Sequence, residues 1–275
     1  MNEVELLREL NADLQTAPAG KVIYLEGKTD LPIFFALLGV PAPRDGVYHG
    51  VYVRALKDNS GMGGSSVMMR VELALARGYR GVRGVIDGDG EALAALARRF
   101  DAPFAGPLFT WKGYAIENLL VKTGWPTAWG AAPSFLQVLL DHAPYVALNR
   151  IYRQLQGRLE TLHLSRYNRP TLSAPLMSVD DVTLALERDR DLVRGYDVAA
   201  QFRTEVATFV ALVGGSEDEG HALVDGKWLV NVFAPRRLGM TPAAAREAWI
   251  AHGRAAGGLS EVRGLWERVA GRPPR

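Results

Sequence analysis

The chain has 275 residues, of which 48% are hydrophobic and 23% are charged, proportions typical of a folded globular protein with one large or two smaller domains. It contains no cysteine, which excludes disulfides and thiolate-bound metals. No apolar stretch is long enough to cross a bilayer, and the acidic N-terminus lacks the basic and apolar blocks of a secretion signal. We therefore expect a cytoplasmic setting and no membrane partner. The net charge of +2 leaves the other partners open.

The first part of the chain alternates between helix and strand patterns. Leucines on one face predict an amphipathic helix over residues 3–16, and residues 21–25 (KVIYL) have strong strand preference. Thr29 or Asp30 is expected to cap a helix that Gly39 ends. This strand, turn and helix form the opening half of a βαβ unit.

Further elements follow the same alternation. Strands are expected over 47–56, 82–87 and 107–111, with helices over 67–77 and 91–100. These elements predict an α/β domain over residues 1–125, with a parallel sheet flanked by helices on both faces. After about residue 126 the patterns are helical, over 134–165, 178–213 and 241–270, which predicts a mainly helical C-terminal domain over 126–275.

Two aspartates end the strand over 82–87. Asp87 and Asp89 are separated by Gly88, and such a pair is costly to bury as ions unless a cation lies between them. Carboxylate oxygens suit Mg²⁺ or Mn²⁺. The alternative interpretation is a solvated Asp-Gly turn.

Three segments in order resemble a TOPRIM domain, the metal-binding fold of topoisomerases, primases and OLD-family nucleases. They read EGKTD at 26–30, DGD at 87–89 and IENLL at 116–120, and their spelling is closest to the OLD-like branch. The resemblance covers roughly residues 20–122 and extends to small TOPRIM effectors of PARIS-type anti-phage systems. It implies a TOPRIM-like Rossmannoid sheet. The segment DGKW at 225–228 resembles the Gly-Lys that closes the core of OLD-like proteins.

The resemblance also implies roles for individual residues. Glu26, Asp87 and Asp89 would hold Mg²⁺ or Mn²⁺, although Glu26 can instead serve as a general base through a bound water. Glu117 would either bind a second metal or be a carboxylate at a helix start. Asp30 would either support the ligands or cap its helix.

Positive charge near these acids would serve phosphate binding. Lys227 and Lys28 can neutralise charge on a phosphate, although the default interpretation of Lys28 is an ordinary surface lysine. Arg150 and Arg153 belong either to a phosphate-contacting face or to an ordinary solvated face. The glycine-rich stretch over 61–66 is either a phosphate cradle or a connector. The five histidines show no metal-ligand spacing.

Three functions remain open from the sequence. The leading hypothesis is a divalent-metal-dependent endonuclease acting on DNA or RNA, as an anti-phage defence effector. No P-loop is present, so any ATPase must be a separate partner. The second hypothesis is a non-catalytic subunit that docks on such an ATPase, and the third is primase-like nucleotidyl transfer. A homo-oligomer is also left open.

Overall fold

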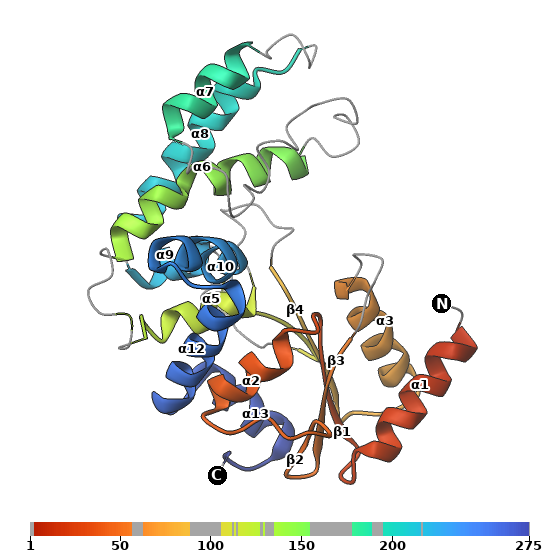
Figure 1. Ribbon diagram of the computed structural model, residues 1–275. Coiled ribbons are helices and arrows are strands. Elements are labelled where there is room, and N and C mark those ends of the chain that lie inside the picture. The colour runs from red at the N-terminus through yellow and green to blue at the C-terminus, as the bar shows by residue number, and fades with distance from the viewer. Residues whose placement is uncertain are drawn as a thin grey trace.

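The structure is a computed structural model that describes residues 3–56, 63–88, 106–111, 113, 115–126, 129, 135–154, 178–188, 195–215 and 217–274. A central sheet carries helices on both faces, and a group of helices formed by α6, α7 and α8 extends away from it (Figure 1). The expected α/β class with a helical C-terminal region is confirmed. The helix expected over 91–100 falls outside the described ranges, as does the part expected over 155–165.

In the described part of the chain, the sheet has five strands in the order β2-β3-β1-β4-β5. Four of them run parallel, namely β1 (Lys21–Leu25), β3 (Val51–Ala55), β4 (Val82–Ile86) and β5 (Leu108–Thr110). The expected parallel sheet is confirmed for these strands, whereas β2 (Val47–Tyr48) pairs antiparallel with β3, which makes the sheet mixed. His49 and Gly50, at φ 47° and 82°, form a tight turn that splits the expected strand into a hairpin.

The central position of β1 in the sheet determines which turns meet at the carboxyl edge of the parallel strands. β1 pairs with β3 on one side and with β4 on the other, so that Tyr24 lies opposite both Arg54 and Gly84. The chain leaves β1 for one side of the sheet and later returns to the other side. The turns after β1 and β4 therefore lie side by side at the carboxyl edge, where parallel sheets form their crevice.

One face of the sheet is covered by α1 (Glu3–Thr16) and α3 (Gly63–Ala76) (Figure 1). Alternate residues of β1 point to this face, and their core includes Leu10, Tyr24 and Val67. A Cβ on Gly84 would lie 2.5 Å from Val67 Cγ1, so glycine permits the close approach of α3 to β4.

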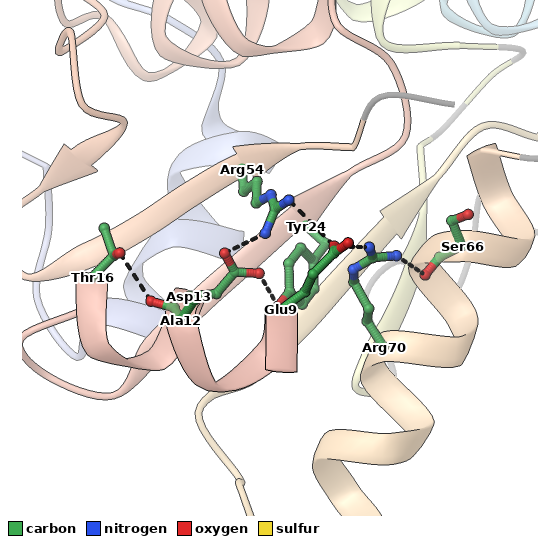
Figure 2. A network of polar contacts seen from close by, with 8 residues as sticks. All are labelled: Glu9, Ala12, Asp13, Thr16, Tyr24, Arg54, Ser66 and Arg70. Carbon is green, nitrogen blue, oxygen red and sulfur yellow. Dashed lines mark hydrogen bonds and ion pairs between the residues drawn. The ribbon is translucent and has the colours of Figure 1, made fainter. Parts of the chain in front are cut away.

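A partly buried polar network joins these two helices to the sheet (Figure 2). The Asp13 carboxylate accepts a hydrogen bond from the Tyr24 hydroxyl at 2.7 Å and pairs with the Arg54 guanidinium. Glu9, one turn earlier on α1, pairs with Arg70 of α3 and with Arg54. Asp13 and Arg70 are each buried, and their charges are compensated by Arg54 and by Glu9, respectively.

The other face carries the larger core, formed with α2 (Asp30–Leu38), α5 (Ile116–Lys122), α12 (Pro242–Ala255) and α13 (Ser260–Ala270). Ile23 and Leu25 of β1 point to this face. Gly39 ends α2 at φ 80°, as its position predicted. The two halves of the sequence thus share this core; the expected division at residue 125 stays a prediction.

The remaining helices add residues to this core or form a second one. A second apolar cluster joins α6 (Phe135–Gln154), α7 (Val179–Arg188) and α8 (Val198–Val213). The chain then returns through α9 (Glu217–Leu223), α10 (Gly226–Trp228), the π-helical turn η4 (Leu229–Phe233) and α11 (Ala234–Leu238). Within the described ranges, no helix has both the length and the apolar content that a membrane crossing requires.

Candidate active site

The first residues after β1 and β4 meet at the carboxyl edge of the sheet. Glu26 directly follows β1 and Asp87 directly follows β4. The backbone N–H of Asp87 donates a hydrogen bond to Glu26 Oε2 at 2.9 Å. The strand order therefore brings together two carboxylates that are 61 positions apart in sequence.

A lysine from the second half of the chain reaches the same edge. Lys227 Nζ donates a hydrogen bond to Asp87 Oδ2 at 2.5 Å, and the two form an ion pair. The Asp87 side chain is 2% exposed whereas that of Lys227 is 39% exposed, so the pair lies at the boundary between core and solvent. The structure thus places Lys227 beside Asp87, where charge on a bound phosphate would need compensation.

Asp30 comes directly after the turn that follows Glu26. The expectation that Asp30 caps α2 is wrong. Thr29 is the cap position, without a side-chain hydrogen bond, and Asp30 is the first helical residue. Asp30 Oδ2 instead accepts a hydrogen bond from Gly27 N at 2.9 Å, because the turn folds back over the carboxylate. Burial raises the pKa of Asp30 to about 6, with a further contribution from Glu26, while the Gly27 N–H and Lys227 oppose the rise.

Glu117 is the fourth acid of the group and comes from the first turn of α5. Burial raises its pKa to about 7, and Asp30 and Asp225 add to the rise while Lys227 opposes it. Burial also raises the pKa of Asp87 well above its usual range, against the opposing effect of Lys227. Within the described part of the chain, Asp87 Oδ1 and Glu117 Oε2 are buried without a hydrogen-bond partner.

Asn118 holds the Lys227 segment against α5. Its Nδ2 donates to the carbonyls of His221, Ala222 and Val224, at 2.9, 3.3 and 2.6 Å. Its Oδ1 accepts from Ala115 N at 2.9 Å, which closes the first turn of α5. No sequence pattern indicated this role, because these acceptors lie 103 to 106 positions away.

Three further residues complete this contact. A Cβ on Gly226 would lie 2.5 Å from Asn118 N, so only glycine lets α10 approach α5 this closely. Asp225 caps α10 by accepting from Trp228 N at 2.9 Å, a pattern that its place before Gly-Lys-Trp could have indicated. His142 Nε2 accepts from Asp225 N at 2.7 Å; burial lowers the pKa of His142 to about 3, which keeps the ring neutral. No sequence pattern pointed to His142.

The other residues predicted for the site either lie away from this acidic group or fall outside the described residues. Asp89 is outside the described residues, and so is the side chain of Arg153. Lys28 is exposed in the turn before α2. Arg150 is only 4% exposed, so the expectation that it contributes to an open basic face is wrong.

The start of α3 also borders the acids. A Cβ on Gly64 would lie 3.4 Å from Glu26 Oε2, so the glycine-rich start of this helix approaches the Glu26 carboxylate. The stretch before it, over 57–62, falls outside the described ranges. The phosphate cradle over 61–66 therefore stays a prediction.

The donor set suits a hard divalent cation. Glu26, Asp30, Asp87 and Glu117 provide carboxylate oxygens, and two buried oxygens of this set have no partner in the described structure. In the described part of the chain, no three such side chains are grouped closely enough to hold an ion as they stand. The third expected ligand, Asp89, is not among those residues.

Comparison of the chain with protein-family models, with curated proteins and with solved structures finds no match. The functional assignment therefore depends on the geometry of this site and on the resemblance of the three motifs.

Proposed function

We propose that the chain is a divalent-metal-dependent nuclease of TOPRIM-like type that hydrolyses phosphodiester bonds in DNA or RNA. The observation that carries this proposal is the meeting of acids from separate segments around one lysine at the carboxyl edge of the sheet. Asp87 is at its centre, bonded to Glu26 through its backbone and to Lys227 through its side chain.

Burial of these carboxylates supports a cation-binding role. Among the described residues, Asp30, Asp87 and Glu117 all interact with Lys227, and burial raises the pKa of all three. Such a group is unfavourable as ions unless further positive charge enters it. The partnerless oxygens Asp87 Oδ1 and Glu117 Oε2 are positions where a cation would replace missing hydrogen bonds.

Each residue has a role in the proposed hydrolysis. Glu26, Asp87 and Asp89 would hold Mg²⁺ or Mn²⁺, and Glu117 and Asp30 would supply further acceptor oxygens. When bound, the ion polarises the phosphate and lowers the pKa of a bound water. Lys227 exchanges its bond to Asp87 for one to a phosphate oxygen, where it offsets developing negative charge. His142 and Asn118 keep the Lys227 segment in place.

The test is cleavage of plasmid, single-stranded DNA and tRNA by the full chain with Mg²⁺, with Mn²⁺ and with a chelator. Asp87→Asn keeps the size of the side chain and removes its charge, and Asp45→Asn makes the same change at an exposed position. We expect metal-dependent cleavage by the wild type and by Asp45→Asn, and a loss of at least a hundredfold for Asp87→Asn. Equal activity of all three proteins, or activity in chelator, would overturn the proposal.

A second candidate function is a non-catalytic subunit of the same fold. The observation that favours it is the ion pair of Lys227 with Asp87, which already occupies one oxygen of the central ligand. This candidate predicts weak or no Mn²⁺ binding and no cleavage of any nucleic acid, with tight association with a separate ATPase. Titration of the chain with Mn²⁺, followed by electron paramagnetic resonance, separates it from the nuclease.

Under both candidates the motif resemblance supports an ATPase partner encoded separately, as part of an anti-phage system. Co-expression with ATPases encoded beside this chain, followed by purification of the complex, tests that part. Cleavage by the isolated chain at the same rate as by the complex would remove the need for a partner.

A further inference from the structure

A second concave site lies at the opposite edge of the sheet from the acids. It is a pocket of about 520 Å³ between the amino ends of β4 and β5 and the last turn of α13. Arg83, near the start of β4, lines the pocket, whereas Asp87 follows the end of that strand. Four residues of strand separate the two positions by roughly 13 Å. The pocket is therefore distinct from the proposed nuclease site.

Three arginines give this pocket its charge. Arg80 precedes β4, Arg83 lies on it, and Arg268 comes from α13, while no carboxylate is present among the described residues that line the pocket. Arg83 Nη1 donates to the carbonyl oxygens of Arg80 and Val82, at 2.6 and 2.9 Å, which fixes its guanidinium against the turn before β4. Guanidinium groups brought together repel one another and match the geometry of phosphate. The pocket is thus arranged for an anion that carries more than one charge.

The walls of the pocket are apolar. Leu75 of α3, Pro107 and Phe109 line it, and Leu75 is 41% exposed. Gly78 also lines it, and a Cβ there would meet nothing within 4 Å, so this side is open to a ligand. A volume of this size lies within the range of small-ligand pockets, and apolar walls with a few charged groups are typical of them. An inorganic ion would leave these walls without contacts.

We propose that this pocket binds a small organic phosphate of nucleotide size. Its phosphate groups pair with Arg80, Arg83 and Arg268, and its organic part lies against Leu75 and Phe109. Because none of the described residues that line the pocket belongs to the carboxylate site, this binding needs neither a divalent metal nor the proposed nuclease activity.

The test measures binding to the full chain by isothermal titration calorimetry at low salt with chelator present, which excludes metal-bridged binding at the acids. The probes are AMP, ATP, inorganic phosphate and a short single-stranded oligonucleotide. Arg80→Gln/Arg268→Gln removes two charges from the pocket, and Arg44→Gln/Arg263→Gln removes two from exposed positions outside it. We expect the pocket variant to lose at least tenfold in nucleotide affinity and the control variant to stay within twofold.

A second pair of variants tests the apolar wall. Leu75→Glu places a negative charge at the pocket, and Met69→Glu does the same on an exposed part of the same helix. We expect only Leu75→Glu to weaken nucleotide binding. Circular dichroism of each variant shows that it is folded. Equal losses in pocket and control variants, equal affinity for inorganic phosphate and nucleotides, tighter binding of the oligonucleotide, or no binding at all would overturn the proposal.

Discussion

The backbone N–H of Asp87 donates its hydrogen bond to the side chain of Glu26, so one carboxylate holds the turn that carries the other. Glu26 accordingly has two separable tasks, which are to accept this hydrogen bond and to supply negative charge. A glutamine can perform the first task through its amide oxygen and cannot perform the second.

Substitution of Glu26 separates these two tasks. We expect Glu26→Gln to keep the wild-type stability while lowering Mn²⁺ affinity at least tenfold. Glu26→Ala is expected to lower Mn²⁺ affinity equally and also to lower the free energy of unfolding by about 1–2 kcal/mol, because Asp87 N loses its acceptor. Urea denaturation and Mn²⁺ titration measure the two effects. Unchanged Mn²⁺ affinity in Glu26→Gln would remove Glu26 from the ligand set.

The stability of the metal-free protein should fall as pH rises because of Glu117. Its pKa is about 7 in the folded state, compared with 4.5 for an ordinary glutamate. The folded state therefore holds the proton more tightly than the unfolded state does. This contribution is fully present below pH 4.5 and is lost as pH rises towards and through 7. We expect the stability of Glu117→Gln relative to wild type to rise over this interval, by at most about 3 kcal/mol.

The control for this pH effect is Glu247→Gln, which makes the same change at an exposed position of α12. Urea denaturation of the three proteins between pH 4 and pH 8, without metal, gives the curves. The Glu247→Gln curve should run parallel to that of the wild type. A Glu117→Gln curve that also runs parallel would show that Glu117 is not held protonated in the folded protein. Added Mn²⁺ should flatten the wild-type decline, because the ion replaces the proton.

Placement of Lys227 should depend on the contact between Gly226 and α5. A methyl group at position 226 collides with the backbone of Asn118, so Gly226→Ala must move α10. We expect a loss of about 1–3 kcal/mol in unfolding free energy and at least a tenfold loss of nuclease activity. Gly264→Ala on α13 is the matched control, since a Cβ there meets nothing within 4 Å, and it should be neutral or slightly stabilising. Similar losses in both variants would contradict this role.

The polar network that joins α1 and α3 to the sheet should contribute more to stability than exposed ion pairs do. Asp13→Ala leaves the Tyr24 hydroxyl and the Arg54 guanidinium without their shared acceptor, and should cost about 3 kcal/mol. Glu3→Gln breaks an exposed pair with Arg77 at 3.7 Å and should cost less than about 0.5 kcal/mol. Thermal unfolding of the two variants at one pH compares them. Equal costs would show that the network contributes no more than the surface pair does.

Local patterns predicted the parts of the fold that depend on neighbouring residues. Apolar runs before Glu26 and Asp87 located β1 and β4, and glycine at position 39 located the end of α2. Errors arose where one residue or a folded turn decided the outcome. A positive φ at His49 made a hairpin from one expected strand, and the fold of the Gly27 turn, not helix propensity, decided the role of Asp30.

Contacts across long sequence separations could not be read from the pattern. Asn118 and His142 support Lys227 through bonds to groups more than 80 positions away, and neither residue type in isolation signals such a task. Arg150 shows the reverse case. It is a charged residue in a basic stretch of the sequence, yet it lies on a buried part of α6. The order of the motifs indicated which acids come together, whereas the groups that surround them follow only from the folded structure.

The bonds from Asn118 to the His221–Val224 segment have a practical consequence for protein engineering. The acidic edge cannot be transplanted as a self-contained cassette ending near residue 125. Such a fragment would retain Glu26 and Asp87 but lack their lysine, and α2 would lose the helices α12 and α13 that pack against it. Any chimera built from this chain must inherit both of its ends.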